Sequence, residues 1–360
     1  MKDFACKDLI GKNINEWYVE DAVVNNDTTA KYTLHYKVTR DGESAIMKVL
    51  DYEKCHNGDL DGARDHLSLI AREANAFDFE MELAKECAEN HMSNVVRYIE
   101  SGSLEMSGYV VKTVSYIIYE YSDGKIGDVL TFSSKADFVA DLGLLVDKLK
   151  SLHQVTKGVK QLHTNLIAHH NITPQSIEVF KNNTQWKIGG LQKSRTRKET
   201  LQSPSSFRLF DGDYTYAPPE AIFGYKLSEE MSTYYQVDTY MLGNLIVYYL
   251  SAMNVTTLIN RKLSCSMKEL ASKGATYLEV LPDIIKAFNE VLDTIRGSIQ
   301  DEELREPIIQ IIKGLCHPDP DKRGYPGGFT RTQANADLQR VLTKLDVLYR
   351  RARLILFKNK

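Results

Sequence analysis

Residues 168–194 combine polar side chains with two short apolar runs, in the sequence AHHNITPQSIEVFKNNTQWKIGGLQKS. The order is a polar loop, a strand-like run, a turn, a second strand-like run and a basic loop. Phosphoryl transfer from this layout needs a carboxylate in the first loop and another after the second run, to take up a proton and to hold magnesium. Between His169 and Ser194 the only acidic residue is Glu178, inside the first run. The stretch therefore has the layout for this chemistry without its carboxylates.

The elements around this stretch form a β-rich first third and a mainly helical remainder. Apolar residues at helical spacing predict a helix over roughly residues 63–90, and the chain beyond residue 135 is mostly helical in pattern apart from 168–194. Asp41-Gly42 supplies a tight turn between two of the strand-like runs. The expected strands are 16–24, 31–39, 44–52, 94–101 and 109–121. We therefore predict an α+β fold with a small antiparallel β lobe and a larger, mainly helical lobe.

In this order the segments resemble a eukaryotic-type protein kinase domain, over roughly residues 15–325. The resemblance rests on AIMKVL (45–50), AFDFEMELAKEC (76–87), HMSNVVRYIESG (91–102), YIIYEYSDG (116–124), VTKGVKQLHTNLIAHHNITPQSIEV (155–179), YAPPEAI (216–222), YQVDTYMLGNLIVYYL (235–250) and GLCHPDPDKRG (314–324). It implies a two-lobed kinase-like fold, with a β lobe and helix C in residues 1–122 and a helical lobe in 123–330. Residues 331–360 would form a basic amphipathic helix after the two lobes.

The resemblance also assigns the residues of a nucleotide pocket. Lys48 takes the place of the lysine that positions ATP, and Glu80 on the apolar face of helix C is its expected partner. Glu73 lies seven residues earlier on the same face and is the second choice. Tyr119 takes the gatekeeper position before the hinge. Lys48 and Glu80 can also form a purely structural ion pair, or Lys48 can bind another anion.

The catalytic positions of the family pattern carry the wrong side chains here. Asn171 stands in place of the catalytic aspartate, Ser176 in place of the following asparagine, and Gly190 in place of the metal-binding aspartate. An amide cannot accept a proton as a carboxylate does, and a serine hydroxyl is a poor ligand for magnesium. We therefore expect no catalytic residue, no metal site and no ordinary phosphoryl transfer.

The expected nucleotide pocket also departs from the family pattern, at positions where the family binds ATP. The segment VVNNDTTAK (23–31) contains no glycine to approach the phosphates, and Asp27 adds a like charge there. Ile46 replaces the small alanine above the adenine, and Glu178 replaces the apolar side chain below it. An unpaired charge beneath a desolvated purine costs on the order of a few kcal/mol. We therefore expect neither ATP nor magnesium as a cofactor.

Residues that hold the kinase fold together are kept. Asp238 matches the aspartate that supports the backbone of the catalytic loop, and Glu220 and Arg323 match a bridge within the larger lobe. This combination predicts a pseudokinase that is not an enzyme and acts as a scaffold or allosteric regulator through protein–protein contacts. The alternative is an atypical nucleotide-dependent kinase or transferase that uses Lys48 without the usual metal ligands, with an acid from DGD (211–213) on the metal.

Two basic segments suggest where partners bind. Residues 193–206 form a basic, hydroxyl-rich segment, which is a solvated activation segment, a phosphorylated switch or a site for an anionic partner. A phosphate beside Arg195 and Arg197 could order it. In residues 338–360, seven basic residues accompany one acidic residue. An apolar stripe runs through that segment at Leu338, Val341, Leu342, Leu345, Leu348, Ala352 and Ile355. The stripe favours packing on the larger lobe, and a protein partner or an anionic membrane or nucleic acid is the alternative.

Composition is that of an ordinary globular protein. Apolar residues make up 43% of the 360 residues and charged residues 26%, and the net charge of −3 gives no general reason to expect nucleic acid. The five cysteines show no metal-binding spacing and are expected to be reduced thiols. We find neither a signal peptide nor a run of about 20 apolar residues, so we expect a cytoplasmic protein without a transmembrane segment.

Overall fold

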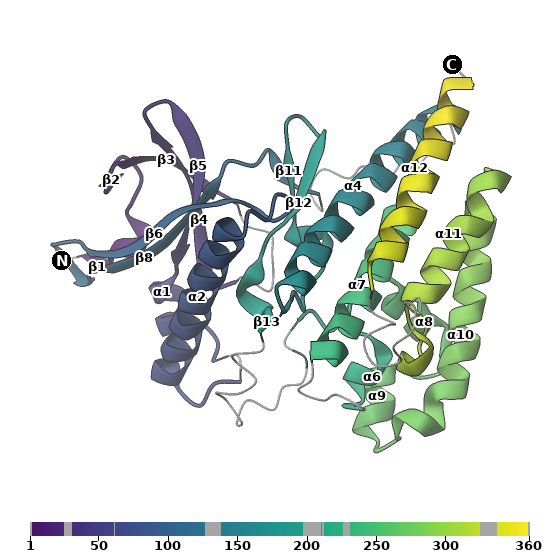
Figure 1. Cartoon of the computed structure of the whole chain (residues 1–360). Coiled ribbons are helices and arrows are strands. Elements are labelled where there is room, and N and C mark those ends of the chain that lie inside the picture. The colour runs from purple at the N-terminus through teal and green to yellow at the C-terminus, as the bar shows by residue number, and fades with distance from the viewer. Residues whose placement is uncertain are drawn as a thin grey trace.

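The computed structural model describes residues 2–24, 31–60, 62–126, 138–196, 210, 212–225, 231–324 and 337–358. Figure 1 shows a β-rich lobe that contains the amino terminus and a helical lobe that contains the carboxyl terminus. This two-lobed α+β arrangement confirms the predicted fold class. Asp27, Arg197, Asp211 and residues 331–336 lie outside the described residues.

The smaller lobe is built on a six-stranded antiparallel sheet with the order β2-β3-β4-β5-β8-β6. Its strands are β2 (Asn13–Ile14), β3 (Trp17–Val23), β4 (Thr33–Arg40), β5 (Glu43–Leu50), β6 (Tyr98–Glu105) and β8 (Thr113–Glu120). The predicted meander is confirmed as β3-β4-β5. Alternate residues of these strands, among them Val19, Tyr36 and Met47, form a buried core on one face of the sheet. The opposite face is left for the cleft between the lobes.

Helix α2 (His66–Glu89) crosses the smaller lobe and begins at a capping box between Asp65 and Ser68. The predicted helix therefore exists but begins three residues later than expected. Several small elements were not predicted, among them a short helix and a short strand. Helix α1 (Tyr52–Asn57) takes up the last residue assigned to a strand, and β1 (Lys2–Phe4) pairs in parallel with β7 (Tyr109–Val111).

The larger lobe packs around helix α7 (Met231–Ser251), which is buried along most of its length. The surrounding helices are α4 (Phe138–Thr164), α6 (Pro219–Ile222), α8 (Val255–Lys262), α9 (Met267–Ser272), α10 (Tyr277–Ser298) and α11 (Glu302–Leu315). In the described ranges, no single helix is long and apolar enough to cross a membrane, although α7 and α8 pass that test as a pair bent by 78°.

The last helix, α12 (Gln339–Lys358), lies against α4 and α11 (Figure 1). The predicted apolar stripe faces the lobe, because its members from Leu338 to Ala352 are all buried and Ile355 is partly buried. The opposite face remains exposed, with Val347, Leu354 and Phe357 open to solvent. The prediction that the apolar stripe of this helix packs on the larger lobe is therefore confirmed.

A β-hairpin sits between the cleft and the helical lobe. It consists of β11 (Ile177–Phe180) and β12 (Gln185–Ile188), and β11 also pairs with β9 (Gly124–Lys125), the first strand after the hinge. Ile177 and Val179 point into the core, which leaves Glu178 on the other face of the strand toward the cleft. The hairpin thereby fixes the floor of the candidate site.

Candidate functional site

Lys48 is held inside the cleft by two protein side chains. Its Nζ lies 2.6 Å from Oε2 of Glu80 and donates to Oε1 of Gln192 at 3.2 Å. Lys48 is 5% exposed and Glu80 1%, so both charges are removed from water. Strand β5 and helix α2 thus bring together the pair expected from the sequence. The contact to Gln192, which follows the hairpin, was not foreseen.

The second carboxylate oxygen of Glu80 is also occupied. The hydroxyl of Tyr119 donates to Oε1 of Glu80 at 3.3 Å. Burial, followed by the charge of Glu80, raises the pKa of Tyr119 well above its usual value of 10. The alternative partner Glu73 instead lies 2.8 Å from its neighbour Arg72, measured from Oε1 to Nη2. Tyr119 at the gatekeeper position and Glu80 on α2 therefore belong to one buried polar cluster with Lys48.

The roof of the cleft carries a histidine that the sequence reading missed. His35 on β4 stands directly across from Lys48 on β5 and lines the same cavity as Ile46. Within the described part of the chain, its Nε2 is buried and has no hydrogen-bond partner. Burial, followed by the charges of Lys125 and Lys48, lowers the pKa of His35 well below 6.5. The two-residue alternation with the buried Tyr36 would have identified His35 as facing the cleft.

Glu178 forms the floor and is paired within the protein. Ser122 Oγ donates to its Oε2 at 2.8 Å, and Lys125 Nζ lies 3.7 Å from its Oε1. The charge predicted to be costly under a purine is therefore compensated in the protein itself. Roof and floor leave a cavity of about 190 Å³ between them. This volume is below the roughly 300–1,000 Å³ of typical ligand pockets.

The loop below the cleft is anchored by a buried aspartate. Asp238 on α7 accepts hydrogen bonds from the backbone N–H groups of His169 and His170, both at 2.7 Å, through its two carboxylate oxygens. Nε2 of His163 lies 2.8 Å from Oδ2. Burial alone would raise the pKa of Asp238, but the hydrogen bond and charge of His163 outweigh it and the pKa is lowered. Asp238 therefore occupies the supporting position expected from the sequence.

The three positions expected to be degenerate lie around this anchored loop. The Asn171 side-chain oxygen accepts a hydrogen bond from the backbone N–H of Asp213 at 3.0 Å. The Ser176 hydroxyl donates to the carbonyl oxygen of Thr173 at 2.8 Å, so it closes a local turn. Gly190 adopts a left-handed backbone with φ of 72°. Each of these groups is neutral.

A family model for the protein kinase domain matches residues 41–329 of this sequence. The chain belongs to the protein kinase family. The match covers the cleft apart from its lining residues in the segment from β3 to β4, the anchored loop and most of the helical lobe, and it confirms the resemblance to the protein kinase family. A probable serine/threonine-protein kinase of Dictyostelium discoideum, irlA, is 27% identical over 251 residues. That similarity covers 66% of this chain but only 16% of the relative.

The kinase domain is braced by a second buried ion pair. Both terminal nitrogens of the Arg323 guanidinium, Nη1 and Nη2, donate to the Glu220 carboxylate, with Nη2 to Oε2 at 2.8 Å. Arg323 also donates to the carbonyl oxygens of His317 and Pro318 and has no exposed surface. Bidentate geometry of this kind is among the stronger charged contacts in proteins. The bridge expected from the sequence is present and joins α6 to the segment after α11.

Proposed function

We propose that this kinase domain is a pseudokinase that acts through protein–protein contacts, as a scaffold or an allosteric regulator. The observation that carries the proposal is the neutral character of Asn171, Ser176 and Gly190 around a loop that is still anchored by Asp238. Kinase chemistry depends on positioning and on neutralising phosphate charge with metal ions. A domain that keeps its supports and lacks the metal ligands is suited to binding partners.

Magnesium is a poor fit for this cleft. It requires hard oxygen ligands at short range and is normally held by one or two carboxylates together with phosphates. Four carboxylates line the described cleft: Glu80, Glu120, Asp123 and Glu178. A lysine lies beside Glu80, Glu120 and Glu178, and Asp123 accepts a hydrogen bond from the backbone N–H of Asn182 at 2.8 Å. Gln192 presents an amide oxygen to Lys48 where charge would be needed. We derive no catalytic step through magnesium for this protein.

ATP is a poor fit for the same cleft. The ammonium of Lys48 already contacts Glu80 and Gln192, so an incoming phosphate would have to share it with these two buried contacts. The adenine would have to lie between His35 and Ile46 above and the Glu178–Lys125 pair below. An adenine there would cover the remaining exposed surface of that pair, 15% of Lys125 and 18% of Glu178, and would offer neither charge a new ionic partner. These contacts support a domain that works without nucleotide.

The second candidate is an atypical nucleotide-dependent kinase or transferase. Asp213 favours it, because its backbone lies against Asn171 and brings an acid close to the catalytic loop. The Oδ1 atom of Asp213, however, accepts hydrogen bonds from the N–H and hydroxyl of Thr215, both at 2.8 Å. The carboxylate is therefore engaged in a local turn. A rotated Asp213 would be needed to hold a metal ion.

A phosphate-transfer assay separates the two candidates. The purified protein would be incubated with γ-labelled ATP and magnesium or manganese, alone and with a general acceptor protein. We expect incorporation no higher than that of an Asp213→Asn variant prepared in parallel. Higher phosphate incorporation by the wild type than by the Asp213→Asn variant would establish the atypical enzyme and overturn the pseudokinase proposal. We place the protein in the cytoplasm as part of the same proposal.

A further inference from the structure

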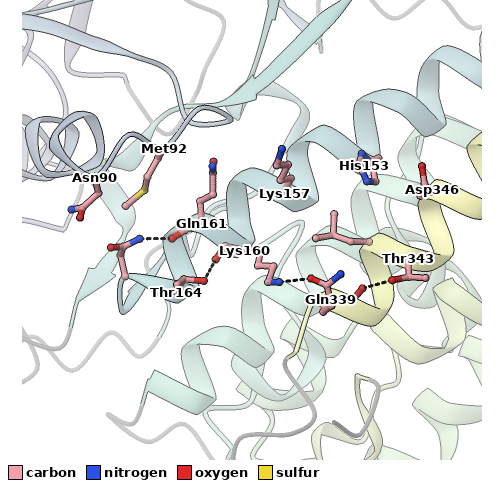
Figure 2. A pocket seen from close by; sticks show the side chains of 12 residues that line it. Asn90, Met92, His153, Lys157, Lys160, Gln161, Thr164, Gln339, Thr343 and Asp346 are labelled. Carbon is pink, nitrogen blue, oxygen red and sulfur yellow. Dashed lines mark hydrogen bonds between the residues drawn. The ribbon is translucent and has the colours of Figure 1, made fainter. Parts of the chain in front are cut away.

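A groove runs along the outer face of α4, away from the nucleotide cleft. It consists of two hollows of about 560 Å³ and 590 Å³ that share His153 and Lys157. Figure 2 shows the first hollow, with Lys157 and His153 on α4, Asp346 and Thr343 on α12, and Met92 on the opposite side. The second hollow continues toward the β11–β12 turn. We call the two hollows together the α4 groove.

The α4 groove is basic in a protein whose net charge is −3. Its described lining contains one carboxylate, Asp346, and the Asp346 Oδ2 atom already lies 3.0 Å from Nε of Arg350. The lysines of the lining are Lys150, Lys157, Lys160 and Lys181. Lys160 donates to the side chain of Gln339 on α12, and Lys150 lies over the ring of Trp186. The groove therefore offers a concentrated positive charge to a ligand.

The lysines of α4 follow one face of the helix. Lys150, Lys157 and Lys160 are spaced by seven and three residues, which places them in a row on an α-helix. From Lys150 to Thr164 the helix rises by about 21 Å, at roughly 1.5 Å per residue. An extended peptide covers that distance with about six residues, at roughly 3.3 Å each. The groove thus matches a short extended segment in length.

The remaining lining favours a peptide over a nucleic acid. The amide of Gln185 can pair with the N–H and C=O groups of an extended main chain. The amides of Asn90 and Gln161 also line the groove but already bond within the protein, to Glu86 and to Asn94 and Ser93. Phenylalanine, tyrosine and tryptophan are missing from the described lining, so His153 is the one ring there on which a base could stack. The lining cations are lysines, and arginine forks that grip phosphates are missing from its described part.

We propose that the α4 groove binds an extended acidic peptide segment of a partner protein. The inference rests on the proposed function, because it names the class of partner that the pseudokinase would hold. Four lysines facing about six residues of chain call for a segment rich in aspartate or glutamate. The groove is preformed by packing, since α12 lies against α4 and a glycine, Gly158, lets α4 approach the backbone at Asn94.

The test uses the full chain and two labelled peptides of twelve residues. One carries six glutamates flanked by glycine and serine, and the other carries six glutamines in their place. Fluorescence anisotropy at low salt should show binding of the glutamate peptide and at least ten-fold weaker binding of the glutamine peptide. The Lys150→Glu/Lys157→Glu variant should weaken binding of the glutamate peptide at least ten-fold.

The control variant is Lys268→Glu/Lys286→Glu, which makes the same change of charge on exposed residues of α9 and α10. It should leave binding within two-fold of the wild type. Equal losses in both variants, equal binding of both peptides, or no binding of either would overturn the proposal. Tighter binding of a labelled twelve-residue oligouridine that the groove variant abolishes would overturn it in favour of a nucleic-acid site.

Failure of this inference is distinct from failure of the proposed function. The peptide measurement contains no nucleotide, whereas the pseudokinase proposal is tested by phosphate transfer. If neither peptide binding nor phosphate transfer is observed, the pseudokinase proposal stands, but the α4 groove is not its binding site. Peptide binding together with phosphate transfer would leave the groove in place on an active enzyme.

Discussion

Lys48 illustrates how a residue type can persist in a cleft while its partners change. Its ammonium contacts Glu80 and Gln192, both of which lie outside β5. The residue as a whole is 5% exposed to solvent. A lysine buried this deeply requires an opposite charge nearby, whatever else it does. The contacts support a structural role that does not depend on a phosphate.

Substitution of Lys48 tests that structural role without nucleotide. Lys48→Met leaves the Glu80 carboxylate buried without its cation, so we expect a loss of about 3–5 kcal/mol in the free energy of unfolding. Lys48→Met/Glu80→Leu removes both charges and should recover most of that loss. Urea denaturation of the two single variants and the double variant measures the coupling. Wild-type stability of Lys48→Met would show that the pair does not support the fold.

His35 predicts a particular dependence of stability on pH. Its pKa in the folded protein lies well below 6.5, so below pH 6.5 the unfolded chain binds a proton that the folded chain does not. Its contribution to stability is therefore lost as the pH falls below 6.5. His35→Val should remove this loss, so the stability of the variant relative to wild type should rise from pH 7 to pH 5.

Chemical denaturation at several pH values measures this difference, with His56→Gln as the control at an exposed histidine. The control should follow the wild-type curve. Parallel curves for wild type and His35→Val would show that His35 is protonated freely in the folded state.

At the scale of elements, helix α4 connects the site to the α4 groove. One of its faces packs on β12 and α7, and another forms the groove floor. At Gly158 an added Cβ would lie 2.5 Å from the carbonyl oxygen of Asn94 and 2.9 Å from Cγ2 of Ile188. The close approach of helix, loop and hairpin therefore depends on the missing side chain.

Two glycines of the same helix give opposite predictions. Gly143 has no neighbour within 4 Å of an added Cβ, so Gly143→Ala should stabilise by up to about 1 kcal/mol through helix propensity. Gly158→Ala gains the same propensity but overpacks the contact, so we expect a net loss of about 1–2 kcal/mol. Thermal unfolding should show a higher Tm for the first variant and a lower Tm for the second. A raised Tm for Gly158→Ala would contradict the packing described for α4.

The elements also show what could be predicted from sequence. Strand alternation and helical spacing predicted β3, β4, β5 and the face of α2 that carries Glu80, because these patterns are local. Helix α1, strand β1 and the contact between Lys48 and Gln192 were missed. Helix α1 has six residues, which is too short for a helical pattern to be recognised. Strand β1 pairs with β7, and Gln192 lies 144 positions after Lys48, so both depend on residues far apart in the chain. The α4 groove is of the same kind, since its walls come from separate segments.

At the scale of the whole molecule, the supports of the kinase fold join distant segments. Asp238 holds the loop at His169 and His170, and Arg323 joins the end of the lobe to Glu220. These contacts explain why the family resemblance is strong even where the catalytic residues are replaced. A conformation that partners can recognise requires them, whether or not phosphate is transferred.

Removing Glu220 should destabilise the whole larger lobe. Glu220→Ala leaves the fully buried guanidinium of Arg323 without its counter-charge, so we expect a loss of at least about 3 kcal/mol in the free energy of unfolding. The matched control is Glu290→Ala, which breaks an exposed contact with Lys262 at 4.0 Å and should change stability by less than about 1 kcal/mol. Urea denaturation compares the two. Similar small losses would show that the buried bridge adds little to the fold.

The central claim is that this protein keeps the kinase fold without using nucleotide, and a thermal-shift titration tests it most directly. ATP and ADP would be raised to millimolar concentration with and without magnesium or manganese, with the metal alone as control. Ligand at about 100 times its Kd would stabilise the folded protein by about 2.7 kcal/mol, which is several degrees in Tm. We predict no change in Tm beyond that of the metal alone. A saturable rise of several degrees with either nucleotide would contradict the account.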